Sequence, residues 1–442
     1  MKTAFVKRIS GKIDPYEFLL TLVFRTVTSV PVGLGILTSL LNLLVSREAL
    51  HQRFNERTEK FFGACLALIL SKRLLSGSQI ETGLMGMFPE ILIIDSSSWK
   101  ISEKLEWIFP GCGGSGGKAG CKLQFCYDYL TGEFQLLDAM EGKLPDQKYT
   151  RNLPAIMSKG AIVIFDLGYW AFDTLFDILQ KGSFFLSRLN TRVQLWEKNG
   201  DTYTAVDLVK TLKNCTEQGI EVELYLNKGD KFVKVRLVGY RVPEETANIR
   251  RMKARRNSQK KGHTASERTL FHCNWSLFIS NVDTKKLPGK MLRTLYRLRW
   301  NVELIFKSWK SILRMHKTNV RKNAHRIKCE LYAKLILATI IHRIHHHLNS
   351  YMWNSLKREL SLDKLWKYIQ VRIETLHKKM LQGADRFTAY INSLLENIIV
   401  VCEKKHQKKR KTTLQLIDEM IGDAQPLKKG IELKYIEKFK LA

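Results

Sequence analysis

The chain is poor in acidic residues for its length. Its 442 residues include 42 Asp and Glu against 73 Lys and Arg, so the formal net charge is +31. Such a chain repels itself unless a polyanion uses the charge, and a phosphate backbone or an anionic membrane surface would do so. Hydrophobic residues make up 45% of the sequence, which excludes global disorder. The length suggests about two to four folded units, and the charge favours a nucleic acid as partner.

Zinc motifs, disulfide patterns and secretion signals are missing. The eight cysteines are scattered and no pair has C-x2-C spacing, so we expect free thiols. The N-terminus has no apolar segment backed by a small-residue cleavage site, which argues against secretion. Residues 26–45 carry no charge, but Pro, Gly, Ser and Thr interrupt the run. Two packed helices with a turn at Pro31–Gly35 explain it better than a membrane span, and we expect no membrane partner.

The first 85 residues have helical patterns. Asp14 and Pro15 are suited to the N-cap and first turn of one helix. Ser46 is suited to cap a second helix over residues 47–70. One face of this second helix is expected to be basic: Arg47, His51, Arg53, Arg57 and Lys60. The pattern predicts a helical N-terminal DNA-binding domain, although a merely solvated basic face would look the same.

Residues 90–166 and 184–282 have β character, and residues 167–179 between them are helical in pattern. EILIID (90–95) and AIVIFD (161–166) are apolar runs that end in aspartate, typical of central strands covered on both faces. Two further strands are predicted around a turn at Thr131–Gly132, and a hairpin around Lys228–Asp230. Residues 249–261 carry seven basic residues without apolar periodicity, which predicts a mobile basic loop. Residues 291–314 and most of the chain after 331 are predicted to be helical.

Two aspartates at the ends of buried strands need a partner, and a divalent cation suits a pair of carboxylates. Many α/β proteins nevertheless place an acidic residue there without a catalytic role. The helix predicted over residues 291–314 adds a second observation. At 100° per residue, five polar side chains fall within about 80° of one another: Tyr296, Arg299, Glu303, Lys307 and Lys310. An ordinary amphipathic helix with a solvated polar face would accept the same pattern.

The spacing Tyr296-x2-Arg299-x3-Glu303-x6-Lys310 resembles the Y-(2)-R-(3)-E-(6)-K signature of the insertion-sequence-four family of DDE transposases. Asp95-Ser96-Ser97 is similar to the first aspartate motif of that family. Asp166-x-Gly168-Tyr169 is similar to its second motif, D-x-G-[FY]. The segments 122–134 and 275–281 also resemble family landmarks. The resemblance covers roughly residues 14–348 and is weakest in the last hundred residues.

The resemblance implies an α/β chain with an RNase H-like catalytic domain. In it, Asp95, Asp166 and Glu303 are the catalytic residues and bind two Mg²⁺ ions, for which Mn²⁺ can substitute. DNA and phosphate contacts are implied for a further set: Tyr296, Arg299, Lys310, Lys307, Trp300 and Arg188. Trp300 would stack on a flipped base, with simple packing as the alternative. Arg188 is equally compatible with a structural salt bridge.

The spacing of the three acidic residues agrees with an interrupted domain. Glu303 follows Asp166 by 137 residues (303 − 166), more than a strand-to-helix connection needs. We therefore expect five segments: a helical N-terminal DNA-binding domain (1–85), the first part of the catalytic domain (86–183), a β-strand insertion (184–285), the second part of the catalytic domain (286–348), and a helical C-terminal region for DNA contact or oligomerisation (349–442).

Two motifs invite other interpretations. The Gly-rich stretch 111–120 resembles a phosphate loop, but Cys112 and Ala119 stand where that loop needs Gly and Ser or Thr, so no nucleotide is expected. The histidines within 342–347 point in different directions on a helix, which favours a basic or packed face over a metal site.

The resulting hypothesis is a bacterial transposase, cytoplasmic and associated with the nucleoid. It would bind the terminal inverted repeats of its element as double-stranded DNA, cleave the ends, and join the 3′-OH ends to target DNA. A homodimer is expected in the synaptic complex. The alternatives are a nuclease or resolvase on the same fold without strand transfer, and an inactive DNA-binding derivative.

Overall fold

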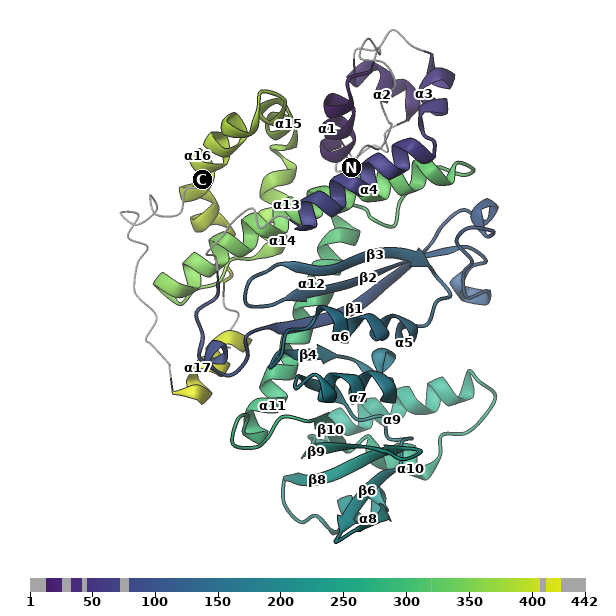
Figure 1. Cartoon of the computed structure of the whole chain (residues 1–442), viewed down its shortest axis with the longest axis vertical. Coiled ribbons are helices and arrows are strands. Elements are labelled where there is room, and N and C mark those ends of the chain that lie inside the picture. The colour runs from purple at the N-terminus through teal and green to yellow at the C-terminus, as the bar shows by residue number, and fades with distance from the viewer. Residues whose placement is uncertain are drawn as a thin grey trace.

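The computed structural model describes residues 13–25, 33–41, 46–71, 79–318, 320–405 and 411–422. It has the predicted mixed α/β class, with a ten-stranded sheet between layers of helices (Figure 1). The strand order is β3-β2-β1-β4-β5-β10-β9-β8-β6-β7. The strands are β1 (Ile91–Lys100), β2 (Gly120–Asp128), β3 (Phe134–Glu141), β4 (Ile162–Phe165), β5 (Phe184–Arg188), β6 (Leu195–Asn199), β7 (Thr202–Val206), β8 (Gly219–Lys228), β9 (Lys231–Arg241) and β10 (Trp275–Ser280).

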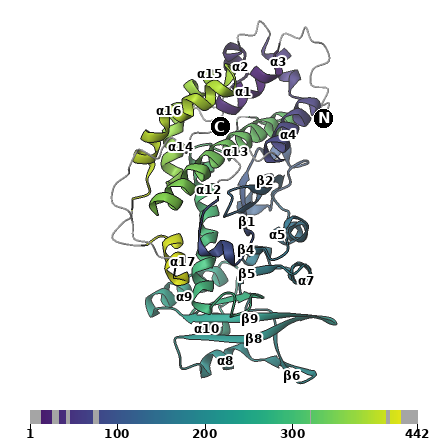
Figure 2. The same ribbon diagram turned by 60° about the vertical axis from the view of Figure 1, so that its left-hand side comes forward.

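The two apolar runs that end in aspartate form β1 and β4, and both are buried on two faces as predicted. The strands pair in parallel, with Ile91 opposite Ile162. Side chains alternate along a strand, so Ile91 and Ile93 join one apolar core whereas Leu92 and Ile94 join the other. Helices α5 (Asp146–Tyr149) and α7 (Phe172–Gln180) lie on one side of the sheet, and α12 (Trp300–Ser311) lies on the other (Figure 2).

Strands β6–β10 continue the same sheet. β10 pairs antiparallel with β5, which itself pairs in parallel with β4. The predicted hairpin is present as β8 and β9, and Gly229 at its turn has φ +59°. Helices α8 (Leu208–Asn214), α9 (Glu244–Gln259) and α10 (Glu267–His272) accompany these strands. The segment between Asp166 and Glu303 therefore extends the sheet that carries the two aspartates.

The prediction of a mobile loop over residues 249–261 is wrong, because most of this segment belongs to α9. Glu244 and Glu245 lie in the first turn, where their negative charges stabilise the positive end of the helix dipole. Arg, Lys, Met and Ala have high helix propensity. The helix has no apolar periodicity because Ala247 is its one buried residue among those described. Hydrogen bonds from Arg250 to the Trp275 carbonyl and the Ser276 hydroxyl attach the helix to β10.

The N-terminal helices are α1 (Pro15–Arg25), α2 (Leu34–Leu40), α3 (Arg47–Arg53) and α4 (Glu56–Ser71). The predicted caps are confirmed: the amide of Glu17 donates to Asp14 and that of Ala49 donates to Ser46. The single helix predicted over 47–70 is wrong, since Asn55 accepts from the amide of Arg57 and starts α4 as a new helix. Residues 26–32 and 42–45 of the tested apolar run lie outside the described residues. In the rest of the described chain no helix has the length and apolarity to cross a bilayer.

The C-terminal helices are α13 (Ala324–Leu356), α14 (Leu362–Gln370), α15 (Ile373–Leu381), α16 (Ala384–Cys402) and α17 (Thr413–Ile421). The long helix α13 packs against α4, and α1 packs against α15 (Figure 1). The N-terminal helices and α13–α16 thus share one helical layer above the sheet (Figure 1), whereas α17 packs against α11. All eight cysteines are free thiols, as predicted.

Candidate active site

The helix that carries Glu303 is broken where the sequence predicts continuity. Helix α11 (Gly289–Tyr296) is followed by a 3-10 turn over Arg297–Arg299, and α12 then ends at Ser311. The prediction of one helix over 291–314 is therefore wrong. A 3-10 turn advances about 120° per residue instead of 100°, so its three residues complete one turn and Tyr296 stays on the same stripe as Arg299. Tyr296 is buried, with its ring 5.1 Å from that of Phe278.

The strand geometry brings the two aspartates together. β1 pairs Ile93 with Ile164, and the same register continued by two residues places Asp95 opposite Asp166. Alternation puts both on the face of Ile93 and Ile164, which is the face covered by α12. The amide of Ser96 donates to Asp95 Oδ1 at 2.8 Å, and that of Gly168 donates to Asp166 Oδ1 at 2.8 Å.

Arg299 joins two of the three predicted catalytic carboxylates. Its Nη1 lies 2.7 Å from Asp95 Oδ2, and its Nη2 donates to Glu303 Oε1. Burial raises the pKa of Asp95 to about 6, and the charges of Asp166 and Glu303 add to this. The Ser96 amide and the Arg299 guanidinium act in the opposite direction. Three carboxylates thus crowd one place, where a single guanidinium compensates part of their charge.

These groups line an open cavity of about 730 Å³. Arg299, Glu303, Lys307 and Lys310 come from α12 and the turn before it, and Asp95 and Asp166 form the wall from the sheet. Three carboxylates are a suitable donor set for hard divalent cations. In the described part of the chain, however, no three acidic, His or Cys side chains already have the arrangement of a metal site. The residues fit a metal on the condition that Arg299 leaves its ion pairs.

The other predicted DNA-contacting residues are distributed around this cavity. Lys307 and Lys310 line it. Trp300 is not among the lining residues, but 59% of its surface is exposed, which contradicts simple core packing. Arg188 lies at the end of β5, and its guanidinium is 5.8 Å from the centre of the Tyr296 ring. The structure places no acidic partner on Arg188 among the described salt bridges.

A hydrogen-bonded group lies beside the second aspartate motif, and sequence reasoning missed most of it. Gln124 donates to Asp146 at 2.7 Å and accepts a hydrogen bond from the Tyr169 hydroxyl. A Cβ on Gly168 would lie 3.1 Å from Asp166 Oδ1 and 3.4 Å from Asp146 Oδ2, so this position favours glycine. The D-x-G-Y motif pointed to Gly168 and Tyr169. No sequence signal identified Asp146 or Gln124, which lie far from that motif in the chain.

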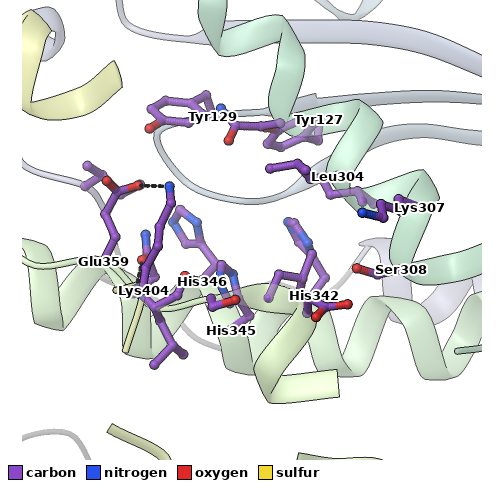
Figure 3. Close-up of a pocket in the computed structure, with 18 residues that line it drawn as sticks. Tyr127, Tyr129, Leu304, Lys307, Ser308, His342, His345, His346, Glu359 and Lys404 are labelled. Atoms are coloured by element: carbon purple, nitrogen blue, oxygen red, sulfur yellow. Dashed lines mark hydrogen bonds and ion pairs between the residues drawn. The ribbon is translucent and has the colours of Figure 1, made fainter. Parts of the chain in front are cut away.

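A second cavity, of about 270 Å³, lies on the other side of α12 (Figure 3). Lys307 borders both cavities. His342, His345 and His346 of α13 form its floor, opposite Tyr127 and Tyr129 (Figure 3). Burial lowers the pKa of His345 to about 4 and that of His342 well below its ordinary value. His342 and His345 are therefore packed and neutral, which agrees with the packed face that the sequence favoured over a metal site.

Comparison with known proteins agrees with this geometry. The family model described as transposase DDE domain matches residues 86–340, a segment that contains all three carboxylates. The chain is 28% identical over 391 residues to the transposase for insertion sequence element IS231E of Bacillus thuringiensis subsp. finitimus, covering 85% of this chain and 81% of that protein. It is 25% identical over 433 residues to the transposase for insertion sequence element IS1151 of Clostridium perfringens, covering 93% and 91%. Because the matched segment is more than half of the 442 residues, the chain belongs to the transposase DDE domain family.

Proposed function

We propose that the chain is the transposase of an insertion sequence, which binds the terminal inverted repeats of its element, cleaves the DNA at the ends and joins the 3′-OH ends to target DNA. The convergence of Asp95, Asp166 and Glu303 on one cavity carries the proposal. Family membership implies an RNase H-like catalytic fold and a divalent-metal requirement. The names of the relatives support action on mobile DNA. The residues between Asp166 and Glu303 would then be an insertion into the catalytic domain.

The three carboxylates would hold two Mg²⁺ ions, or Mn²⁺ in their place, which lower the pKa of the attacking hydroxyl and stabilise charge on the attacking and leaving oxygens. Asp95 lies within β1, which runs on to Lys100 beyond the predicted strand end, whereas Asp166 directly follows β4. Each carboxylate accepts a hydrogen bond from a backbone amide. Glu303 is carried by α12, whose apolar face is fixed in the core by Trp309. Such supports keep the acidic groups in place while DNA enters and leaves.

The cations on the rim of the cavity position the DNA. Lys307 and Lys310 of α12 line the cavity and bind phosphates next to the scissile bond. Arg299 exchanges the carboxylates for a phosphate of the bound strand, because its planar fork suits both kinds of anion. Trp300 is exposed on the same helix and stacks on an unpaired base at the cut end.

The test is incubation of flanked terminal-repeat duplexes with the protein and Mg²⁺, followed by separation of nicked, hairpinned and joined products. Asp95→Asn, Asp166→Asn and Glu303→Gln should each abolish cleavage yet leave end binding intact, because each variant loses a metal ligand and keeps its volume. Ca²⁺ should support binding without cleavage, since it takes more ligands at longer distances than Mg²⁺.

Asp173→Asn is the matched control, because Asp173 is an exposed carboxylate of α7 that pairs with Lys228. It should cleave like the unmodified protein. More than a few per cent of residual cleavage in any of the three site variants would contradict the assignment of that residue. Cleavage without joined products would instead favour the alternative nuclease or resolvase, and native binding without any cleavage would favour the inactive derivative. We expect a homodimer in the synaptic complex and action on DNA in the bacterial nucleoid. Sedimentation of the protein with two terminal-repeat ends should therefore give the mass of a complex that contains two copies of the chain.

A further inference from the structure

A basic cleft lies beside the candidate active site. It has a volume of about 440 Å³ and is lined by cationic or titratable side chains from three segments: Arg188, Arg192, Arg250 and His272. Within the described chain, none of its lining residues is acidic. Both ring nitrogens of His272 are buried without a described hydrogen-bond partner. The guanidinium groups therefore converge without a compensating carboxylate, an arrangement suited to an anion.

The cleft and the catalytic cavity are neighbours. Leu167, the residue after Asp166, lines the cleft. Arg188 lines it too and reaches the ring of Tyr296, three residues before Arg299. Burial lowers the pKa of Arg250, and the nearby positive charge of Arg188 lowers it further, which agrees with crowded like charges. Cations consequently continue from the catalytic cavity into the cleft.

Helix α9 extends this basic surface. Arg250 lines the cleft from α9, which lies at the periphery of the molecule next to α10 (Figure 1). At about 100° per residue, Lys253, Arg256 and Lys260 fall on one face of the helix or its last turn, and all three are exposed. We call these three residues the cationic stripe. None of them belongs to a salt bridge of the described residues, in contrast to Arg251, which pairs with Glu244.

Two exposed apolar residues accompany the cationic stripe, Ile249 within its face and Met252 at its edge beside Arg256. Ile249 and Met252 are 62% and 66% exposed, next to Lys253 and Arg256. A face that combines unpaired cations with exposed aliphatic groups suits a nucleic-acid groove, where phosphates and sugars alternate. The 16 residues of α9 span about 24 Å, the length of roughly seven base-pair steps.

We infer that the basic cleft and the cationic stripe of α9 bind the backbone of the DNA duplex that continues out of the catalytic cavity. The inference rests on the proposed function, because it needs a scissile phosphodiester in that cavity. It assigns to the segment after Asp166 a second DNA-binding surface, separate from the residues that perform chemistry. The surface would contribute affinity through phosphate contacts and carry little sequence information.

The test measures binding without divalent metal, so that no DNA is cut. Two terminal-repeat duplexes are compared. The truncated duplex ends at the cleavage site, and the extended duplex continues about twelve base pairs beyond it. The triple variant Lys253→Gln, Arg256→Gln and Lys260→Gln should bind an extended duplex roughly 10- to 100-fold more weakly at 150 mM salt. The slope of log affinity against log salt should become shallower by about 3, or about 1 for each lost phosphate contact. Binding of the truncated duplex should change little.

Arg255→Gln is the matched control, because Arg255 is exposed on α9 but points about 100° or more away from each member of the cationic stripe. It should leave the slope unchanged. A photo-crosslinking amino acid at Met252 should label the extended part of the duplex. Unchanged slopes in the triple variant, an equal effect of Arg255→Gln, or crosslinks to separately added target DNA or to a second copy of the chain would each overturn the inference.

The outcome is separable from that of the proposed function. If the unmodified protein cleaves end DNA with Mg²⁺ but the triple variant shows no altered salt slope, the inference fails and the transposase assignment stands. If the unmodified protein cleaves nothing, the proposed function fails. A circular dichroism melt of the triple variant should match that of the unmodified protein, because all three replaced side chains are exposed.

Discussion

Replacing Arg299 with Gln should strengthen divalent-metal binding while it impairs DNA cleavage. Arg299 forms ion pairs with both Asp95 and Glu303, the two carboxylates that a metal would need. A cation that enters the site must either displace the guanidinium or share the carboxylates with it. Removing the guanidinium therefore removes a competitor of the metal, although it also removes a group that we expect to hold the DNA phosphate.

The magnitude follows from the two ion pairs. A hydrogen bond between charged groups contributes about 1.5–3 kcal/mol. The Glu303 side chain is 35% exposed, so solvent weakens its share and the pair with Asp95 dominates. If displacing Arg299 costs about 1–3 kcal/mol of the binding free energy of the metal, the Arg299→Gln variant should bind the metal roughly 5- to 100-fold more tightly. Without metal, the variant should be less stable by about 2–4 kcal/mol, because buried Asp95 loses its partner.

Calorimetric titration with Ca²⁺ and Mg²⁺ at pH 7.5 measures the affinity, and urea unfolding with and without metal measures the stability. Arg297→Gln is the control, because Arg297 is exposed in the same 3-10 turn. It should change neither quantity. Equal metal affinity in Arg299→Gln and the unmodified protein would refute the competition, and so would equal stabilisation by metal in both.

Three further predictions concern single sites. Trp300→Ala should leave the melting temperature unchanged because Trp300 is exposed. It should weaken end cleavage by about 1–3 kcal/mol, the contribution of one base–aromatic stack, and an abasic end should remove most of that defect. A large fall in stability would show a core role instead. Gly132 has φ +69°, and a Cβ there would lie 2.2 Å from Cγ of His346. Gly132→Ala should therefore lower the free energy of unfolding by about 2–5 kcal/mol. Gly229 has φ +59° but open space around it, so the control Gly229→Ala should lower the free energy of unfolding by only about 1 kcal/mol. Burial raises the pKa of Asp95 from 3.8 to about 6, so the metal-free folded protein retains a proton that the unfolded chain releases. Its free energy of unfolding should therefore fall as pH rises from about 4 to about 6, and urea unfolding of Asp95→Asn in chelator should lack that part of the decline.

Local patterns predicted much of the fold. The runs before Asp95 and Asp166 are apolar at every position, and they form β1 and β4 with two buried faces. Turn residues located the hairpin at Gly229, and cap residues located the starts of α1 and α3. These features depend on neighbours in the chain, so the sequence carries them directly.

Features set by distant contacts could not be predicted in the same way. Helix α9 lacks an apolar stripe because it is largely exposed, and hydrogen bonds to β10 hold it in place. The 3-10 turn before Trp300 has no Pro or Gly to announce it. The link from Tyr169 through Gln124 to Asp146 joins three separate segments. Long-range pairing of this kind leaves no periodic pattern in any one of them.

The register of β1 and β4 explains why the three carboxylates meet although Glu303 is so far along the chain. Alternation fixes Asp95 and Asp166 on the face that α12 covers, and a shift of either strand by one residue would turn its aspartate to the opposite face. Because both runs are apolar at every position, hydrophobicity alone would tolerate such a shift, and the close fit of the individual side chains in the two cores opposes it. The same apolar residues that stabilise the sheet therefore fix the geometry of the acidic groups, and substitutions at Ile93 or Ile164 should affect catalysis through register as well as through stability.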